Sequence, residues 1–112
     1  MKQGEIWLVN LDPTVGAEIK KTRPSLIING DALGKLPLKI IVPITVWKEH
    51  YNVAPWMIKI EPKQENGLNK ISSIDCFQIR SVSQDRLVER IGKVTINEIN
   101  KVQDGIAKVL GL

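Results

Sequence analysis

The stretch Leu38-Lys39-Ile40-Ile41-Val42-Pro43-Ile44-Thr45 is a nearly continuous apolar run, rich in β-branched residues. A run of this kind is typical of a strand that is buried on both faces. Pro43 has no amide hydrogen, so it favours a strand edge or a bulge over a central, fully paired position. Just upstream, Ser25 to Ile28 predicts a second strand, which ends at the turn signal Asn29-Gly30-Asp31. This part of the chain therefore predicts a β-rich domain.

Further short strands are predicted on both sides of this pair. Glu5 to Val9 reads as a strand that is followed by the turn-forming residues Asn10, Asp12 and Pro13. Residues 11–22 then form a long polar loop without a steady period. Downstream strands are predicted over 56–60, 71–82 and 87–94. Within 71–82 the apolar residues change from even-numbered to odd-numbered positions (an apolar parity shift), so this segment is predicted as one or two short strands.

The C-terminal segment is predicted to be a helix. Thr95 and Glu98 have the spacing of a capping box, apolar residues follow at helical spacing, and Gly111 is placed to end the helix. Several short strands and one terminal helix predict a mainly β fold with a C-terminal α-helix. We expect a small barrel rather than a sandwich or a βαβ sheet.

Length and composition point to one domain over residues 1–112. The chain is 43% hydrophobic, but it has no apolar run near the ~20 residues that a membrane-spanning helix needs. Its start has no signal-peptide pattern, so we expect a cytoplasmic protein without membrane association. Cys76 is the only cysteine, which excludes an intramolecular disulfide and a Cys-based metal site, and we expect a buried, inert thiol.

Charge adds a weak functional signal. Sixteen Lys and Arg residues against twelve Asp and Glu residues give a net charge of +4, which favours a polyanionic partner but is common in ordinary proteins. Lys20, Lys21 and Arg23 form the densest positive cluster. Phosphate-binding glycine loops, zinc-ligand clusters and serine-hydrolase elbows are absent from the sequence. His50 is the only histidine, so a two-histidine nuclease site is excluded, and a solvated loop residue is the better interpretation.

The loop Asp12-Pro13-Thr14-Val15-Gly16-Ala17-Glu18-Ile19-Lys20-Lys21-Thr22-Arg23-Pro24 is the best candidate for a functional segment. Charged loops between rigid strands often carry binding and catalytic groups. Pro24 restricts Arg23 to an extended backbone, and the planar guanidinium fork suits phosphate oxygens. Taken alone, an ordinary solvated basic loop would explain the segment equally well.

With its flanking segments, however, the loop resembles the MazF/PemK family of toxin endoribonucleases, and the resemblance runs nearly end to end. The matching segments, in chain order, are Gly4-Glu5-Ile6-Trp7 with Leu11-Asp12-Pro13, Val15-Gly16-Ala17-Glu18 with Lys21-Thr22-Arg23-Pro24, Pro43-Ile44-Thr45, Gln78-Ile79-Arg80-Ser81-Val82 with Asp85-Arg86-Leu87, and Ile91-Gly92-Lys93-Val94. Any one segment is weak evidence. Their occurrence in the right order within 112 residues is strong evidence.

The resemblance implies an SH3-like or plasmid-maintenance-toxin barrel that works as a homodimer. It implies sequence-specific cleavage of single-stranded RNA (mRNA) with no metal and no cofactor. The implied catalytic residues are Arg23 and Thr45. The implied protein partner is an antitoxin, and we expect an acidic, disordered C-terminal segment that folds over the RNA groove.

The chemistry of RNA agrees with this reading. The 2′-hydroxyl is a nucleophile that the substrate itself carries, and its attack gives a 2′,3′-cyclic phosphate and a 5′-hydroxyl. Arg23 can neutralise the charge that develops on the phosphoryl oxygens, and Thr45 can donate a further hydrogen bond. Arg23 is a poor base because an arginine side chain keeps its proton in proteins, so Glu18 is the nearest candidate base. The residues predicted to bind RNA are Lys20, Lys21, Gln78 and Arg80, although Arg80 can equally support the barrel.

Two alternatives remain open at this stage. One is a toxin of the same fold that poisons DNA gyrase without nuclease activity, and the other is a nucleic-acid-binding barrel without activity. Residues 47–56 match no segment of the family. There, Trp47, Tyr51 and Trp56 can stack on bases or pack internally, and internal packing is favoured for Trp56.

Overall fold

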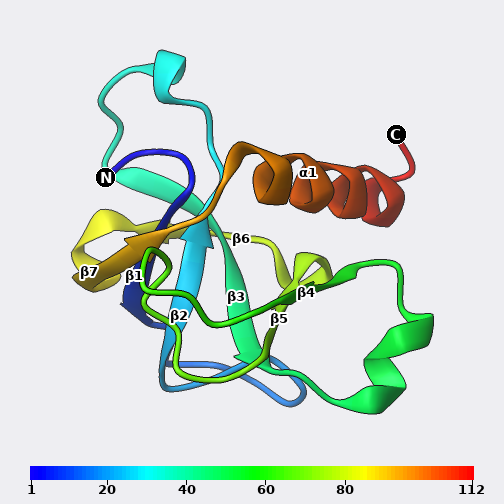
Figure 1. Cartoon of the computed structure of the whole chain (residues 1–112). Helices are drawn as coiled ribbons and strands as arrows, with labels where there is room; N and C mark the ends of the chain where they lie inside the picture. The colour runs from blue at the N-terminus through cyan, green and yellow to red at the C-terminus, as the bar shows by residue number, and fades with distance from the viewer.

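The computed structural model describes residues 1–112 and consists of a seven-stranded antiparallel sheet with one C-terminal helix (Figure 1). The strands are β1 (Glu5–Asn10), β2 (Thr22–Ile27), β3 (Leu38–Val46), β4 (Met57–Ile60), β5 (Ser72–Asp75), β6 (Arg80–Ser83) and β7 (Leu87–Lys93). Four short 3₁₀ turns lie between them, η1 (Asp31–Leu33), η2 (Glu49–Val53), η3 (Cys76–Gln78) and η4 (Gln84–Arg86), and the helix is α1 (Ile96–Leu110). The strand order is β4-β5-β3-β2-β1-β7, and β6 pairs with β3. The prediction of a mainly β fold with a C-terminal helix is confirmed.

Strand β3 is the centre of the sheet, so the edge position predicted as one setting for Pro43 is wrong. The prediction that Pro43 is not in a fully paired position is confirmed, since neither ladder on the far side from β2 includes it. One side of β3 pairs with β2, while the other side pairs with β6 through Leu38–Ile41 and with β5 through Ile44–Val46. Pro43 lies where β3 leaves β6 and joins β5. A residue without an amide hydrogen is tolerated there because the ladder on that side is already interrupted.

The apolar run of β3 is also less buried than the sequence predicted. Residues 41–44 are buried, whereas Leu38 is 51% and Ile40 is 38% exposed. Both exposed side chains lie on one face of β3, because alternate residues of a strand point the same way. The first half of β3 therefore has one exposed face.

Two hydrophobic clusters pack on the two faces of the sheet. The larger contains Ile6, Leu26, Val42, Ile44, Ile60, Leu68, Ile74, Cys76 and Val102, and α1 covers it. The smaller contains Val9, Leu11, Ile27, Ile41, Val82 and Leu87. The face with the smaller cluster also carries the candidate site described below.

Helix α1 begins and ends as predicted. Thr95 and Glu98 form a complete capping box, and Gly111 ends the helix in the left-handed conformation, with φ 72°. Gly105 lies against Cys76, since a Cβ at this glycine would be 3.0 Å from the Cys76 sulfur. Burial, with a smaller effect of the Asp75 charge, raises the pKa of the Cys76 thiol to about 12. The prediction of a buried thiol is confirmed, and a raised pKa agrees with the unreactive side chain that was expected.

Strand β2 begins three residues earlier than predicted, so Arg23 lies in a strand and not in a loop. Asn10 pairs with Thr22 and Val9 pairs with Arg23, which extends the β1–β2 ladder through Pro24. The parity shift that the sequence shows between 71 and 82 is the short turn η3, which separates β5 from β6.

One buried hydroxyl leads to a stability prediction. Ser25 is fully buried opposite Pro43, and its Oγ has no hydrogen-bond partner in the protein. An unpaired buried polar group costs about 1–3 kcal/mol, so Ser25→Ala is expected to stabilise the fold by about 1 kcal/mol in urea unfolding. Ser72 is the matched control, because it is a buried strand serine whose Oγ donates to the Lys70 carbonyl at 2.8 Å. A loss of stability as large in Ser25→Ala as in Ser72→Ala would contradict this account.

Candidate functional site

The sheet forks at the point where the two predicted catalytic residues lie. The last paired residues of β2 and β3 are Ser25 and Pro43. Beyond them, β2 continues beside β1 and β3 continues beside β5. Extending the β2–β3 register by two residues places Arg23 opposite Thr45, one on each branch of the fork. Both residues share the sheet face of Pro43, because they are two residues from a paired position.

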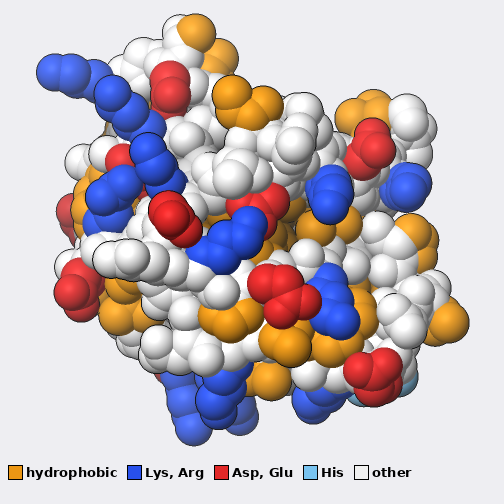
Figure 2. All heavy atoms as spheres, in the orientation of Figure 1, with side chains coloured by type: hydrophobic (Ala, Val, Ile, Leu, Met, Phe, Trp, Pro, Cys, Tyr) orange, Lys and Arg blue, Asp and Glu red, His pale blue; other side chains and the backbone are white.

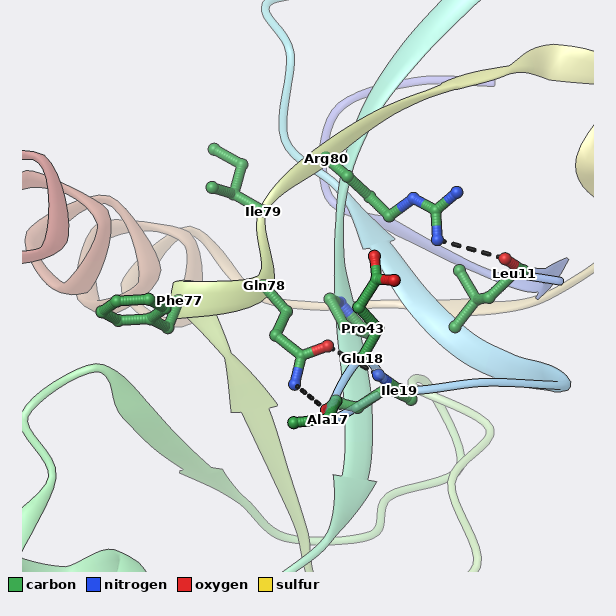
Figure 3. Close-up of a pocket in the computed structure, with 9 residues that line it drawn as sticks. All are labelled: Leu11, Ala17, Glu18, Ile19, Pro43, Phe77, Gln78, Ile79 and Arg80. Atoms are coloured by element: carbon green, nitrogen blue, oxygen red, sulfur yellow. Dashed lines mark hydrogen bonds between the residues drawn. The ribbon is translucent and has the colours of Figure 1, made fainter. Parts of the chain in front are cut away.

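A pocket of about 490 Å³ opens on this same face (Figure 3). Its volume is in the range usual for ligand pockets. Two of its sides come from distant parts of the chain, one from the β1–β2 loop and the other from η3 and the start of β6. The lining residues are Leu11, Ala17, Glu18, Ile19, Pro43, Phe77, Gln78, Ile79 and Arg80. Pro43 connects this pocket to the fork.

The Gln78 side chain holds the tip of the β1–β2 loop. Its Oε1 accepts a hydrogen bond from the Ile19 amide at 2.7 Å, and its Nε2 donates to the Ala17 carbonyl at 3.4 Å (Figure 3). A role in contacting RNA bases was predicted for Gln78, whereas here its carboxamide is bonded to the loop backbone. One lone pair of Oε1 and one N–H of Nε2 are not used by these two bonds, so Gln78 keeps one acceptor and one donor position for a base.

The acidic residues of the loop bind backbone amides and form no ion pairs. Glu18 Oε1 accepts from the Val15 amide at 2.6 Å, which leaves Oε2 without a partner. Asp12 Oδ1 accepts from the Lys21 amide at 3.1 Å and from Thr14 Oγ1 at 3.3 Å. The basic cluster beside them is therefore not neutralised by direct pairing.

Lys20, Lys21 and Arg23 are all exposed. Figure 2 shows Lys and Arg side chains projecting at the lower edge of the molecule, where Figure 1 places the β1–β2 loop. The side chain of Arg23 makes a single hydrogen bond, from Nε to the Lys20 carbonyl at 3.3 Å, and it has no carboxylate partner. Its terminal guanidinium nitrogens are free to bind an anion.

Arg80 lines the pocket, but one of its nitrogens is in use. Its Nη1 donates to the Leu11 carbonyl at 3.1 Å, across the pocket from Gln78 (Figure 3). The sequence left open whether Arg80 contacts phosphate or supports the barrel, and this bond is a supporting contact. A guanidinium has five N–H donors, so other donors remain for a ligand.

The structure adds Phe77, which the sequence reasoning missed. Phe77 is 61% exposed, lines the pocket and meets Trp56 edge to face at a centroid distance of 5.7 Å. Asp75 fixes its backbone by accepting from the Phe77 amide at 3.1 Å. Burial raises the pKa of Asp75, although this hydrogen bond acts in the opposite direction. The sequence signal was weak, because an aromatic residue between strand-forming residues is usually part of a core.

The aromatic residues of 47–56 are mostly engaged with one another. Trp47 and Tyr51 meet edge to face at 5.7 Å, His50 packs on Tyr51 at 4.6 Å, and Lys59 Nζ lies 5.2 Å from the Trp47 ring centroid. Trp56 packs against the larger hydrophobic cluster, as predicted. The contacts of Trp47 and Tyr51 favour the internal-packing interpretation over base stacking.

No group of three or more His, Cys, Asp and Glu side chains is arranged so that it could hold a metal ion. The structure also contains no helix with the length and apolar character needed to cross a membrane.

Comparison with known proteins gives consistent results. A family profile described as "PemK-like, MazF-like toxin of type II toxin-antitoxin system" matches residues 2–110. Endoribonuclease PemK of Escherichia coli is 31% identical over 104 residues, which cover 88% of this chain and 76% of that protein. Endoribonuclease MazF of Staphylococcus saprophyticus is 30% identical over 112 residues, which cover 100% of this chain and 92% of that protein.

Solved structures show the same fold. MazF from Deinococcus radiodurans has a TM-score of 0.82 at 21% identity, with 100% of this chain and 97% of that chain covered. An endoribonuclease in complex with its cognate antitoxin, from a mycobacterial species, has a TM-score of 0.77 at 19% identity, with 100% and 96% covered. The predicted fold family is confirmed by these likenesses.

Proposed function

Because the chain belongs to the PemK-like, MazF-like family of type II toxin–antitoxin toxins, we propose that it is an endoribonuclease that cleaves single-stranded RNA at specific sequences without a metal ion. Cleavage of mRNA inhibits translation and growth. The observation that supports this most directly is the fork in the sheet, where Arg23 and Thr45 lie on opposite branches beside a pocket. The gyrase-poison alternative is not favoured, since the relatives are named endoribonucleases.

Arg23 and Thr45 act on the scissile phosphate in this proposal. The attack of the 2′-hydroxyl on phosphorus builds negative charge on the phosphoryl oxygens, and the bond to the 5′-oxygen then breaks as that oxygen takes a proton from water. Arg23 stabilises that charge through its free guanidinium nitrogens, and Thr45 Oγ donates a neutral hydrogen bond. Donors that are positioned before the reaction stabilise a transition state strongly because they need no reorganisation. The products carry a 2′,3′-cyclic phosphate and a 5′-hydroxyl.

Glu18 is the proposed base that removes the 2′-hydroxyl proton. Its Oε1 is bonded to the Val15 amide, while Oε2 is free and the side chain lines the pocket. A general base must come within hydrogen-bond distance of the proton that it abstracts, and such contacts often form only when the substrate is bound. Glu18 and Pro43 line the same pocket, so the side chain lies on the face that carries the fork.

Incubation of the purified protein with a long, unstructured RNA in EDTA tests the function. We expect discrete cuts that persist in the chelator and whose mapped ends share a short sequence. A protein that binds this RNA but leaves it intact would support the inactive nucleic-acid-binding alternative. Inhibition of DNA gyrase without RNA cleavage would support the gyrase alternative.

The proposed RNA contacts are Lys20, Lys21, Gln78 and Arg80, and the structure adds Phe77 as a surface on which a base can stack. Phe77→Ala is expected to raise KM by about 5- to 150-fold and leave kcat unchanged, because stacking contributes about 1–3 kcal/mol per base. Phe77→Trp is the matched control, since it keeps an aromatic face, and it should retain near-normal KM. A drop in kcat with unchanged KM would argue against a stacking role.

The proposed protein partner is an antitoxin whose acidic, disordered C-terminal segment folds over the pocket and the basic cluster. Lys20→Glu with Lys21→Glu is expected to weaken binding of both this antitoxin and RNA. For single-stranded RNA, a plot of log affinity against log salt concentration has a slope of about −0.7 for each phosphate contact. Loss of two such contacts should therefore make this slope shallower by about 1.4. Isothermal titration at several salt concentrations measures both affinities.

The matched control is Lys101→Glu with Lys108→Glu, which reverses the charge of two exposed lysines of α1. This control should leave the affinities for RNA and for the antitoxin nearly unchanged. If the loop double variant binds the antitoxin normally but loses RNA, the antitoxin binds elsewhere. The main-chain bonds of Lys21, from its amide to Asp12 and from the Leu11 amide to its carbonyl, do not depend on its side chain. The variant should therefore keep its fold.

We also propose that the chain works as a homodimer. In the single chain, exposed apolar side chains lie at the start of β3 and in the segment before it. Leu36 and Leu38 are each 51% exposed there. Exposed apolar patches often mark protein interfaces. Sedimentation equilibrium of the isolated protein measures its mass in solution.

A further inference from the structure

Arg86 continues the edge of the sheet beyond its last paired residues. The β1–β7 ladder ends at Val9 and Leu87, so the next residues outward are Asn10 and Arg86. Arg86 Nη1 donates to the Asn10 carbonyl at 3.1 Å and also to the Asp12 carbonyl. The arginine side chain therefore takes the position that backbone amides of a longer β7 would occupy.

These carbonyls belong to the part of β1 that sets the position of Arg23. Asn10 pairs with Thr22, and Val9 pairs with Arg23. The Leu11 amide donates to the Lys21 carbonyl at 2.9 Å, and Asp12 Oδ1 accepts from the Lys21 amide. Each step from Arg86 to the entrance of β2 is thus a hydrogen bond or a strand pair.

The tip of the same loop is held differently. Residues 15–19 are bonded to the Gln78 side chain and to the carboxylate of Glu18 within the loop, whereas the base of the loop is bonded to arginines. Arg86 binds the carbonyls of Asn10 and Asp12, and Arg80 binds the carbonyl of Leu11, which lies between them in the sequence. The tip can therefore exchange its few bonds for a ligand while the base stays in place.

We propose that Arg86 is a positioning residue that fixes the base of the β1–β2 loop, and through it the place of Arg23 relative to Thr45. The inference rests on the proposed ribonuclease function. Arg86 Nη1 carries two N–H groups, one for each of the two carbonyls, and the planar guanidinium fixes their directions. A lysine ammonium also has several donors, but they rotate at the end of a flexible stem and do not fix these directions. Misplacement of a catalytic group by about 1 Å can cost about 100-fold in rate.

The test compares Arg86→Gln and Arg86→Lys with Arg90→Gln. Arg90 lies on β7, four residues after Arg86, and its Nε pairs with Glu5 at 3.2 Å, away from the loop. We expect both Arg86 variants to lose up to about 100-fold in kcat with unchanged KM. We expect faster hydrogen exchange at the amides of Leu11 and Lys21, with no change at core amides of β3. Arg90→Gln should leave kcat and these exchange rates as in the wild type.

Several outcomes would overturn the proposal. A higher KM with normal kcat in Arg86→Gln, restored in Arg86→Lys, would make Arg86 an RNA contact. Faster exchange throughout the core would make it a general stabiliser of the fold, and unchanged exchange at Leu11 and Lys21 would remove the positioning role. Arg86→Lys keeps the long side chain and its charge, so it serves where Arg86→Gln does not fold. If the wild-type protein does not cleave RNA, the proposed function fails, and the exchange measurement still decides whether Arg86 holds the loop.

Discussion

Arg23→Ala is expected to lower the rate of RNA cleavage by about 10²–10³-fold, because removal of one donor to a developing anion typically costs that much. The substitution should leave the fold intact. Arg23 is exposed, its side chain makes one hydrogen bond to a backbone carbonyl, and its strand pairing to Val9 uses only main-chain atoms. The free energy of unfolding should change by less than about 0.5 kcal/mol, as for other exposed positions. Single-turnover cleavage and urea unfolding measure the two quantities.

Thr45→Ala serves as the graded comparison for this prediction. Thr45 offers a neutral hydrogen bond, and charge-assisted bonds are about twice as strong as neutral ones. The cleavage rate should therefore fall less in Thr45→Ala than in Arg23→Ala. Cleavage at the wild-type rate by folded Arg23→Ala would exclude Arg23 from the reaction and with it the assignment of the fork as the active site.

A substrate with 2′-deoxyribose at the cut nucleotide should not be cleaved at all. The proposed reaction takes its nucleophile from the RNA, so removal of the 2′-oxygen removes the attacking atom itself. The same substitution one nucleotide downstream should leave cleavage nearly unchanged, which makes it the matched control. Gel analysis of both substrates, with the products tested for a cyclic phosphate, measures the effect.

Efficient cleavage of the substituted RNA would mean that water is the nucleophile. The products would then carry a linear phosphate, and the proposed roles of Arg23 and Thr45 would need a separate group to activate that water. This outcome would leave the family membership unaffected, since that rests on the sequence match over residues 2–110.

The elements that the sequence predicted best are those with local signals. The capping box of Thr95 and Glu98 and the glycine end of α1 depend on residues within a few positions of each other, and both are present in the structure. The parity shift between 71 and 82 is likewise local, and it marks η3. Short-range preferences are sufficient for such features.

The errors occur where long-range pairing overrides local preference. Pro24 is a poor strand former, yet β2 extends back through it to Thr22 because Leu8, Val9 and Asn10 pair with this segment. Pro43 suggested an edge or a bulge, and the structure has neither an edge nor full pairing there, because Pro43 lies in a central strand where the partner changes from β6 to β5. Leu38 and Ile40 are as apolar as their buried neighbours, and composition alone does not reveal that no element covers them.

The sequence by itself determined the family, the mainly β class with its terminal helix, and the candidate chemistry, because residue identities and their order along the chain carry this information. Only the tertiary structure decided how these residues meet. It placed Arg23 and Thr45 on the branches of one fork, bonded Gln78 to a loop 59 positions earlier, and set Arg86 on a carbonyl 76 positions earlier. Contacts over such separations depend on strand register, and register is fixed by the whole sheet and its two hydrophobic clusters rather than by any single segment.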